Sequence, residues 1–143
     1  MALYQGTFKP KNPQKYKGNV SNIVFRSSWE LKLMQRLDDD PAIVEWSSEE
    51  LFIPYRSPVD NRYHRYFPDF LVKKNNGEII LIEVKPKKQT KPPEQPAKQT
   101  RRYINEVFTW GVNQAKWKAA TEYCADRKWK FMIMTEDHLG IKF

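Results

Sequence analysis

The sequence has 143 residues and a formal net charge of +8, from 25 basic and 17 acidic side chains. This length suits one domain with one core and excludes two independent ones. The positive charge favours a polyanionic partner such as DNA, because basic side chains that neutralise phosphates release condensed counterions. Since Cys124 is the single cysteine, the sequence excludes an internal disulfide and a structural zinc site built from cysteines and histidines.

The sequence contains neither an apolar run of about 18 residues nor a charged and then apolar leader. We therefore expect a soluble, intracellular protein. Residues 1–22 have no acidic side chain and no sustained hydrophobic period. They predict a basic arm that lies over the domain or over a ligand, followed by a single domain at 23–143. The basic and aromatic residues of the arm are Tyr4, Phe8, Lys9, Lys11, Lys15, Tyr16 and Lys17.

A helix is predicted from Ser27 to Leu37, because Ser27 can cap its start and apolar residues recur on one face. The acidic run that ends in Pro41 terminates it. Two short strands, Ile43–Trp46 and Leu51–Tyr55, are predicted from their β-branched and aromatic residues between polar clusters.

The clearest element is a hairpin of Phe67–Lys74 and Glu78–Lys85 around the turn Asn75-Asn76-Gly77. Both strands are apolar on both faces, which is typical of central strands covered by structure above and below. One predicted face holds Phe70, Val72, Ile80, Ile82 and Val84, and the other holds Phe67, Leu71, Ile79 and Leu81.

The segment 86–100, rich in lysine and proline, predicts an exposed loop or flap, because proline lacks the backbone donor that regular structure needs. A helix at Asn113–Arg127 and a strand at Lys130–Thr135 are predicted next. Trp110, Trp117 and Trp129 are expected to fill core or interface space. Together these elements predict an α/β fold with a central mixed β-sheet flanked by helices.

The hairpin also positions candidate catalytic residues. A three-residue turn that pairs Lys74 with Glu78 would set Asp69 opposite Glu83. Two opposed carboxylates repel each other unless a cation lies between them, and a hard divalent cation meets that need. Lys85 shares the face of Glu83, where it could orient a water or stabilise charge on a phosphate. The simpler interpretation is that Asp69 and Glu83 are solvated charges at the ends of two strands. Lys85 would then be an ordinary exposed lysine.

Glu30 adds a third carboxylate, because it lies in register with the apolar stripe of its helix and so faces the core. The alternative is structural, since Ser27 and Glu30 would complete a capping box by themselves. Both interpretations stay open at this point.

These residues carry a resemblance. Glu30 in FRSSWELKLM, Pro68-Asp69 in RYFPDFLV and Glu83-Val84-Lys85 in LIEVKPKK resemble the P-D…(D/E)-x-K signature of restriction-endonuclease-like nucleases. The later QAKWKAATEYCADRKWKFMIMTEDHL resembles the endonuclease subunit of some transposases. Over nearly its full length, from YQGTFKPKNPQKYKG to EVKPKKQT and beyond, the chain resembles the head completion nucleases of large contractile-tailed phages.

The resemblance implies a restriction-endonuclease-like fold and a Mg²⁺-dependent deoxyribonuclease in which Mn²⁺ can substitute. Its metal ligands would be Glu30, Asp69, Glu83 and the backbone carbonyl of Val84, and Lys85 would complete the catalytic set by positioning water or stabilising charge. It also implies a role in phage head completion after DNA packaging, in the host cytoplasm during assembly or in the virion. The partners would be DNA and proteins of the phage head, portal or neck.

Basic and polar residues around this set are expected to hold the DNA backbone. His64 is interpreted as a surface or phosphate-contacting residue and not as a general base, because an E-x-K site supplies its own activation. A solvated helix face explains the late helix residues nearly as well. The expected DNA-binding residues are Arg62, His64, Arg65, Lys87, Lys88, Lys91, Lys98, Arg101, Arg102, Gln114, Lys116 and Lys118.

The sequence therefore predicts a metal-dependent DNA endonuclease that recognises backbone and shape, since no base-reading module is apparent. Two alternatives remain. One is an endonuclease of recombination or transposition, which would share the site and differ in its substrate. The other is a DNA-binding structural protein of the virion, which would bind DNA without metal-dependent cleavage.

Overall fold

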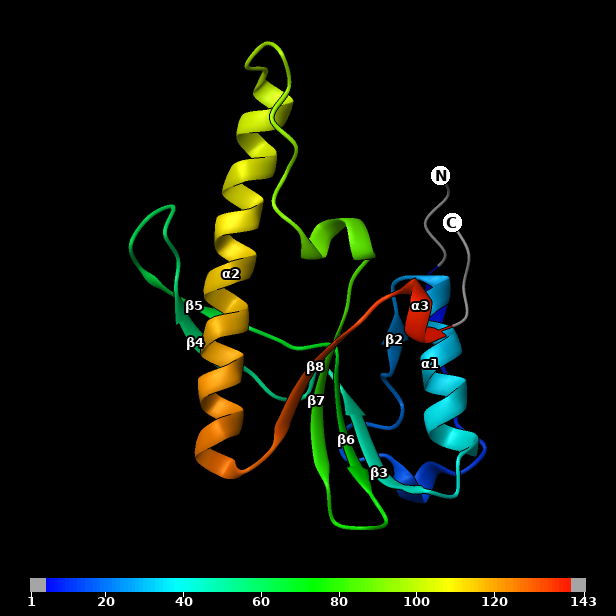
Figure 1. Ribbon diagram of the computed structural model, residues 1–143. Coiled ribbons are helices and arrows are strands. Elements are labelled where there is room, and N and C mark those ends of the chain that lie inside the picture. The colour runs from blue at the N-terminus through cyan, green and yellow to red at the C-terminus, as the bar shows by residue number, and fades with distance from the viewer. Residues whose placement is uncertain (1–4, 140–143) are drawn as a thin grey trace.

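The computed structural model describes residues 5–139, in which a four-stranded mixed sheet lies between two helices (Figure 1). The strand order is β3-β6-β7-β8, with β8 parallel to β7 and the other neighbours antiparallel. This confirms the predicted α/β class and is consistent with a restriction-endonuclease-like fold. The helices are α1 (Ser28–Asp39), α2 (Arg101–Arg127) and α3 (Glu136–Leu139), with 3-10 turns η1 (Pro13–Lys15) and η2 (Lys87–Thr90). The strands are β1 (Gly6–Thr7), β2 (Val24–Phe25), β3 (Ile43–Ser48), β4 (Ile53–Arg56), β5 (Tyr63–Tyr66), β6 (Phe70–Lys74), β7 (Ile79–Val84) and β8 (Lys130–Met134).

The hairpin β6–β7 has the predicted register. The N–H of Lys74 donates to the carbonyl of Glu78 at 2.8 Å, and Phe70 lies opposite Ile82. Gly77 closes the turn with φ at 88°, a conformation that glycine adopts without steric cost. Since a slip of one residue would turn every side chain to the other face, this turn decides which residues meet at the strand ends.

A separate hydrophobic cluster lies on each face of the sheet. Trp29, Leu33, Met34 and Leu37 of α1 pack on one face, against residues that include Phe70, Val72 and Ile82. Trp117, Ala120 and Cys124 of α2 pack on the other face, with Leu81. The two-sided burial predicted for the hairpin is thus confirmed for its central residues, because each face has a helix to cover it.

Phe67 is an exception, and its predicted place on a buried face is wrong. Its side chain is 45% exposed and lies beside Phe52, with ring centroids 5.9 Å apart. The ladder of β6 begins only at Phe70, after Pro68, which has no N–H to donate. Phe67 therefore lies outside the regular alternation on which the prediction relied.

Helix α2 is longer than predicted: it begins at Arg101 and not at Asn113. The hydroxyl of Thr100 caps it by accepting a hydrogen bond from the N–H of Tyr103, at 3.1 Å. Its first half extends past the sheet beside the flap, residues 86–100 (Figure 1). Ile104, Val107 and Phe108 are exposed there. This half of the helix has no apolar stripe that faces the core, so hydrophobic periodicity could not predict it.

The smaller elements extend the predictions. β4 and β5 form a two-stranded sheet of which only the first strand was expected. In the N-terminal segment, residues 5–22 lie over the domain, with Phe8 and Tyr16 buried and Tyr16 packed edge-on against Trp46. Tyr4 falls outside the described residues.

Within residues 5–139, no helix has both the length and the apolar character needed to cross a membrane.

Candidate active site

Asp69 and Glu83 lie together at one end of the hairpin. Asp69 directly precedes β6, and its carboxylate accepts a hydrogen bond from the N–H of Val84 at 2.7 Å. Glu83 is the residue before Val84 on β7. The predicted register of the hairpin brings these two carboxylates near each other, one residue beyond the last paired residues, Phe70 and Ile82.

Three carboxylates converge at this end of the sheet. Oxygens of Glu30, Glu49 and Asp69 lie within 4.8 Å of one another. Glu30 belongs to the first turn of α1, where the Oγ of Ser27 accepts from its N–H at 3.2 Å and donates to its carboxylate at 3.3 Å. Glu30 thus contributes to the helix cap and to the acidic cluster at once, so the two interpretations of this residue are compatible.

Glu49 was not singled out by the sequence. It directly follows β3 with φ at 54°, and its N–H donates to the carbonyl of Asp69 at 3.2 Å. Its carboxylate pairs with the guanidinium of Arg26. In the sequence, Glu49 belongs to a short polar boundary between two strands, and nothing local distinguishes it from an ordinary loop acid.

Glu83 has its own partners. The hydroxyl of Tyr66 donates to Oε2 of Glu83 at 2.6 Å, and the Nζ of Lys85 lies 3.8 Å from Oε1. Both Tyr66 and Glu83 are buried, at 3% and 7% exposure. Lys85 shares the surroundings of Glu83, as strand alternation predicts. Tyr66 was missed as a partner, because no local pattern in the sequence indicates its contact with Glu83.

The electrostatics of the site disfavour charge on its acids. Burial raises the pKa of Asp69 well above its usual range, and the charge of Glu83 raises it further. Burial also raises the pKa of Glu83, against the hydrogen bond from Tyr66. The pKa of Glu30 is raised by burial and then by Glu49. A cation among these carboxylates would relieve both desolvation and mutual repulsion.

Lys116 approaches the site from α2. Its Nζ lies 5.7 Å from the ring centroid of Tyr55 and 5.6 Å from that of Tyr66. Burial lowers the pKa of Lys116, while the charge of Glu83 opposes that effect. The sequence grouped Lys116 with the DNA-binding residues, and the structure places it partly buried beside the rings of Tyr55 and Tyr66.

Seven of the other predicted DNA-binding residues lie on two surfaces. The first is the β4–β5 hairpin, where Arg62, His64 and Arg65 are exposed. Its His64 contacts the carboxylate of Asp60 at 2.7 Å, and its Arg65 lies over the ring of Phe52. This hairpin flanks the site, because it also carries Tyr66.

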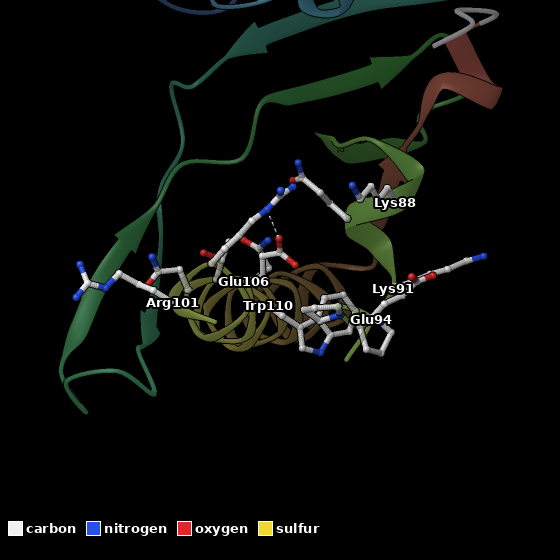
Figure 2. A pocket seen from close by; sticks show the side chains of 13 residues that line it. Lys88, Lys91, Glu94, Arg101, Glu106 and Trp110 are labelled. Carbon is white, nitrogen blue, oxygen red and sulfur yellow. Dashed lines mark hydrogen bonds and ion pairs between the residues drawn. The ribbon is translucent and has the colours of Figure 1, made fainter. Parts of the chain in front are cut away.

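The second surface is a groove of about 1210 Å³ between α2 and the flap (Figure 2). Lys88 and Lys91 of the flap and Arg101 and Arg102 of α2 line it. Lys87 instead pairs with Asp137, at 3.1 Å. The remaining predicted residues, Lys98, Gln114 and Lys118, are exposed.

Two comparisons with known proteins bear on this geometry. Residues 40–136 match the family described as TnsA-like endonuclease N terminal. The chain is also 44% identical over 140 residues to a protein of Enterobacteria phage T4 named head completion nuclease. That similarity covers 95% of this chain and 93% of the phage protein.

Proposed function

Because the chain belongs to the family of TnsA-like endonuclease N-terminal domains, we propose that it is a metal-dependent DNA endonuclease that acts in phage head completion. The resemblances seen in the sequence, to transposase endonuclease subunits and to phage head completion nucleases, are both confirmed. The chain is a nuclease by family, and DNA is its substrate. The metal, the ligands and the role of each residue are our proposal.

The observation that carries the proposal is the convergence of Glu30, Glu49 and Asp69 beside Glu83. Carboxylates whose pKa values are raised by burial and by each other are costly to keep ionised without a cation. The donors are all hard oxygens, which suit Mg²⁺ and Mn²⁺ and do not suit metals that prefer sulfur or imidazole. We therefore propose Mg²⁺ as the cofactor, with Mn²⁺ able to substitute.

The proposed ligands are Glu30, Asp69, Glu83 and the carbonyl of Val84, as the resemblance implies, and the structure adds Glu49 as a candidate. When bound, the metal would polarise the scissile phosphate and make an attacking water more acidic. Lys85 holds a positive charge 3.8 Å from Glu83, where it can stabilise charge on a phosphate oxygen. The hydroxyl of Tyr66 orients Glu83, and Arg26 neutralises part of the acidic cluster through Glu49.

Two basic surfaces, one on the β4–β5 hairpin and one between α2 and the flap, support a path for the DNA backbone. Arg62 and Arg65 lie on the hairpin that carries Tyr66, and Lys88 and Arg102 line the groove beside α2. Such contacts position a duplex without reading its sequence. We propose that the DNA backbone crosses the site between these two surfaces.

The setting follows from the relative that matches nearly the whole chain. The name of that phage protein supports head completion over transposition, because the similarity extends through the N-terminal segment that the family match at 40–136 leaves out. We propose that the protein acts on DNA during head assembly, in the host cytoplasm or in the virion, with head, portal or neck proteins as its partners.

A substrate panel tests this proposal. Supercoiled plasmid, linear duplex and single-stranded DNA are each incubated with Mg²⁺, Mn²⁺, Ca²⁺ or EDTA. We expect cleavage with Mg²⁺ and Mn²⁺ and none with EDTA. Binding to all duplexes without cleavage under any metal would instead support the non-catalytic alternative. Cleavage confined to one defined transposon or junction sequence would support the recombination-type alternative.

A further inference from the structure

Lys116 is held near the site by aromatic rings and not by a carboxylate. Its Nζ lies within 6 Å of two ring centroids, those of Tyr55 on β4 and Tyr66 on β5. A cation at this distance is attracted by the negative face of each ring. Among the ion pairs of residues 5–139, none involves Lys116. Its charge is therefore positioned but not neutralised by a direct salt bridge.

The ring of Tyr66 links Lys116 to the carboxylates. The hydroxyl of Tyr66 donates to Glu83 at 2.6 Å, while the centroid of its ring lies 5.6 Å from the Nζ of Lys116. Lys116 interacts electrostatically with Glu83, Lys85 and Asp69. Lys85 directly follows β7 and lies 3.8 Å from Glu83, and Lys116 belongs to α2. Two lysines from different elements thus face the same end of the sheet.

A solvated helix face does not explain this lysine. Its helix neighbours Gln114 and Lys118 are exposed, whereas Lys116 is partly buried between α2 and the β4–β5 hairpin. Placing an ammonium there costs hydration. The arrangement is favourable when an anion completes it, and the anion of a nuclease site is the phosphodiester.

We propose that Lys116 is a second catalytic lysine, which contacts the reacting phosphate and stabilises the charge that develops on its oxygens, and that Tyr55 is the residue that positions it. The inference rests on the proposed nuclease function and extends it to residues outside the P-D…(D/E)-x-K signature. A preorganised cation aimed at developing charge acts mainly on the chemical step and less on ground-state binding.

The test measures the single-turnover cleavage rate at saturating DNA and Mg²⁺, together with the DNA dissociation constant in Ca²⁺. We expect Lys116→Gln to lower the rate about 100-fold, to change the dissociation constant less than about threefold, and to leave the melting temperature near that of the wild type. Lys116→Arg should recover part of the rate. Lys73→Gln, which removes an exposed lysine near the β6–β7 turn, is the control and should retain full activity.

The positioning role has its own pair of variants. Tyr55→Phe keeps the ring and should keep the rate, while Tyr55→Leu removes the ring and should lower the rate about tenfold. Equal rates for these two folded variants would overturn the role of Tyr55. A Lys116→Gln variant that cleaves normally, or that loses only affinity, would overturn the role of Lys116. A wild type that cleaves no DNA with any metal would overturn the proposed function as well.

Discussion

The carboxylate of Asp69 accepts a hydrogen bond from the backbone N–H of Val84, at 2.7 Å. The bond joins the residue before β6 to the last residue of β7, beyond the point where the two strands stop pairing. It holds the carboxylate of Asp69 beside Glu83 by means of the backbone. The backbone therefore fixes the position of one carboxylate of the proposed metal site.

Replacing Asp69 should stabilise the protein when no metal is bound. Because burial and the charge of Glu83 raise the pKa of Asp69, its ionisation costs folding free energy once the pH exceeds the ordinary value near 4. We expect Asp69→Asn to melt a few degrees above the wild type in EDTA at neutral pH. The difference should grow as the pH rises from about 4, as followed by thermal melts across that range.

The exposed Asp60 provides the control for this measurement. Its pKa is lowered by a hydrogen bond from the N–H of Arg62 and by the contact with His64, so its ionised form stabilises the fold. Asp60→Asn should therefore not raise the melting temperature at neutral pH. If Asp69→Asn melts below the wild type in EDTA, the electrostatic account of the site is wrong.

Two variants distinguish the proposed metal role of Glu30 from the helix-capping role of Ser27. Glu30→Gln keeps a side chain that can accept from the Oγ of Ser27, so the melting temperature should not fall while cleavage is lost. Ser27→Ala removes the cap and should lower stability by about 1 kcal/mol while leaving most of the activity. The reverse pattern, with Glu30→Gln active and Ser27→Ala inactive, would reduce Glu30 to a capping residue.

Tyr66→Phe tests how Glu83 is oriented. The variant keeps the ring near Lys116 and removes only the hydroxyl that donates to Glu83 at 2.6 Å. Loss of such a supporting hydrogen bond should lower the cleavage rate about 10- to 100-fold without abolishing DNA binding. Tyr63→Phe, on the same strand but 74% exposed, should have no effect. Equal activity of the two variants would argue against this orienting role.

The lysines of the flap should affect binding and not chemistry. Replacing Lys87, Lys88, Lys91 and Lys98 with Gln should weaken binding to any DNA sequence. The slope of log affinity against log salt should fall by about 0.9 for each phosphate that the variant no longer neutralises. Since Lys87 already pairs with Asp137, it should contribute least. Cleavage at saturating DNA should persist, and an unchanged salt slope with a collapsed rate would show that the flap takes part in the reaction.

Local rules predicted the centre of the fold well. The turn at Asn75-Asn76-Gly77 and the two apolar faces of its strands specify both the register and the layer on each side. The cap at Ser27 is likewise a local signal, and the helix begins where it predicts. Because the register follows from the turn, the meeting of Asp69 and Glu83 was predictable as well.

Long-range contacts were not predictable in this way. Glu49 joins the acidic cluster through the pairing of β3 with β6. Tyr66 reaches Glu83 from β5, whose partner strand β4 packs against α2. No hydrophobic period in the sequence indicates either contact. The first half of α2 was missed because it covers no core, and Phe67 was misplaced because the ladder begins after Pro68.

Cleavage of supercoiled plasmid by the wild type, Asp69→Asn and Glu83→Gln tests the central claim most directly. With Mg²⁺, the wild type should convert the plasmid to nicked or linear form, and EDTA should stop it. Both variants should be inactive, yet bind DNA in Ca²⁺ with affinity close to that of the wild type, because they remove metal ligands and no basic residue. Wild-type cleavage by either variant, or cleavage that persists in EDTA, would contradict the account.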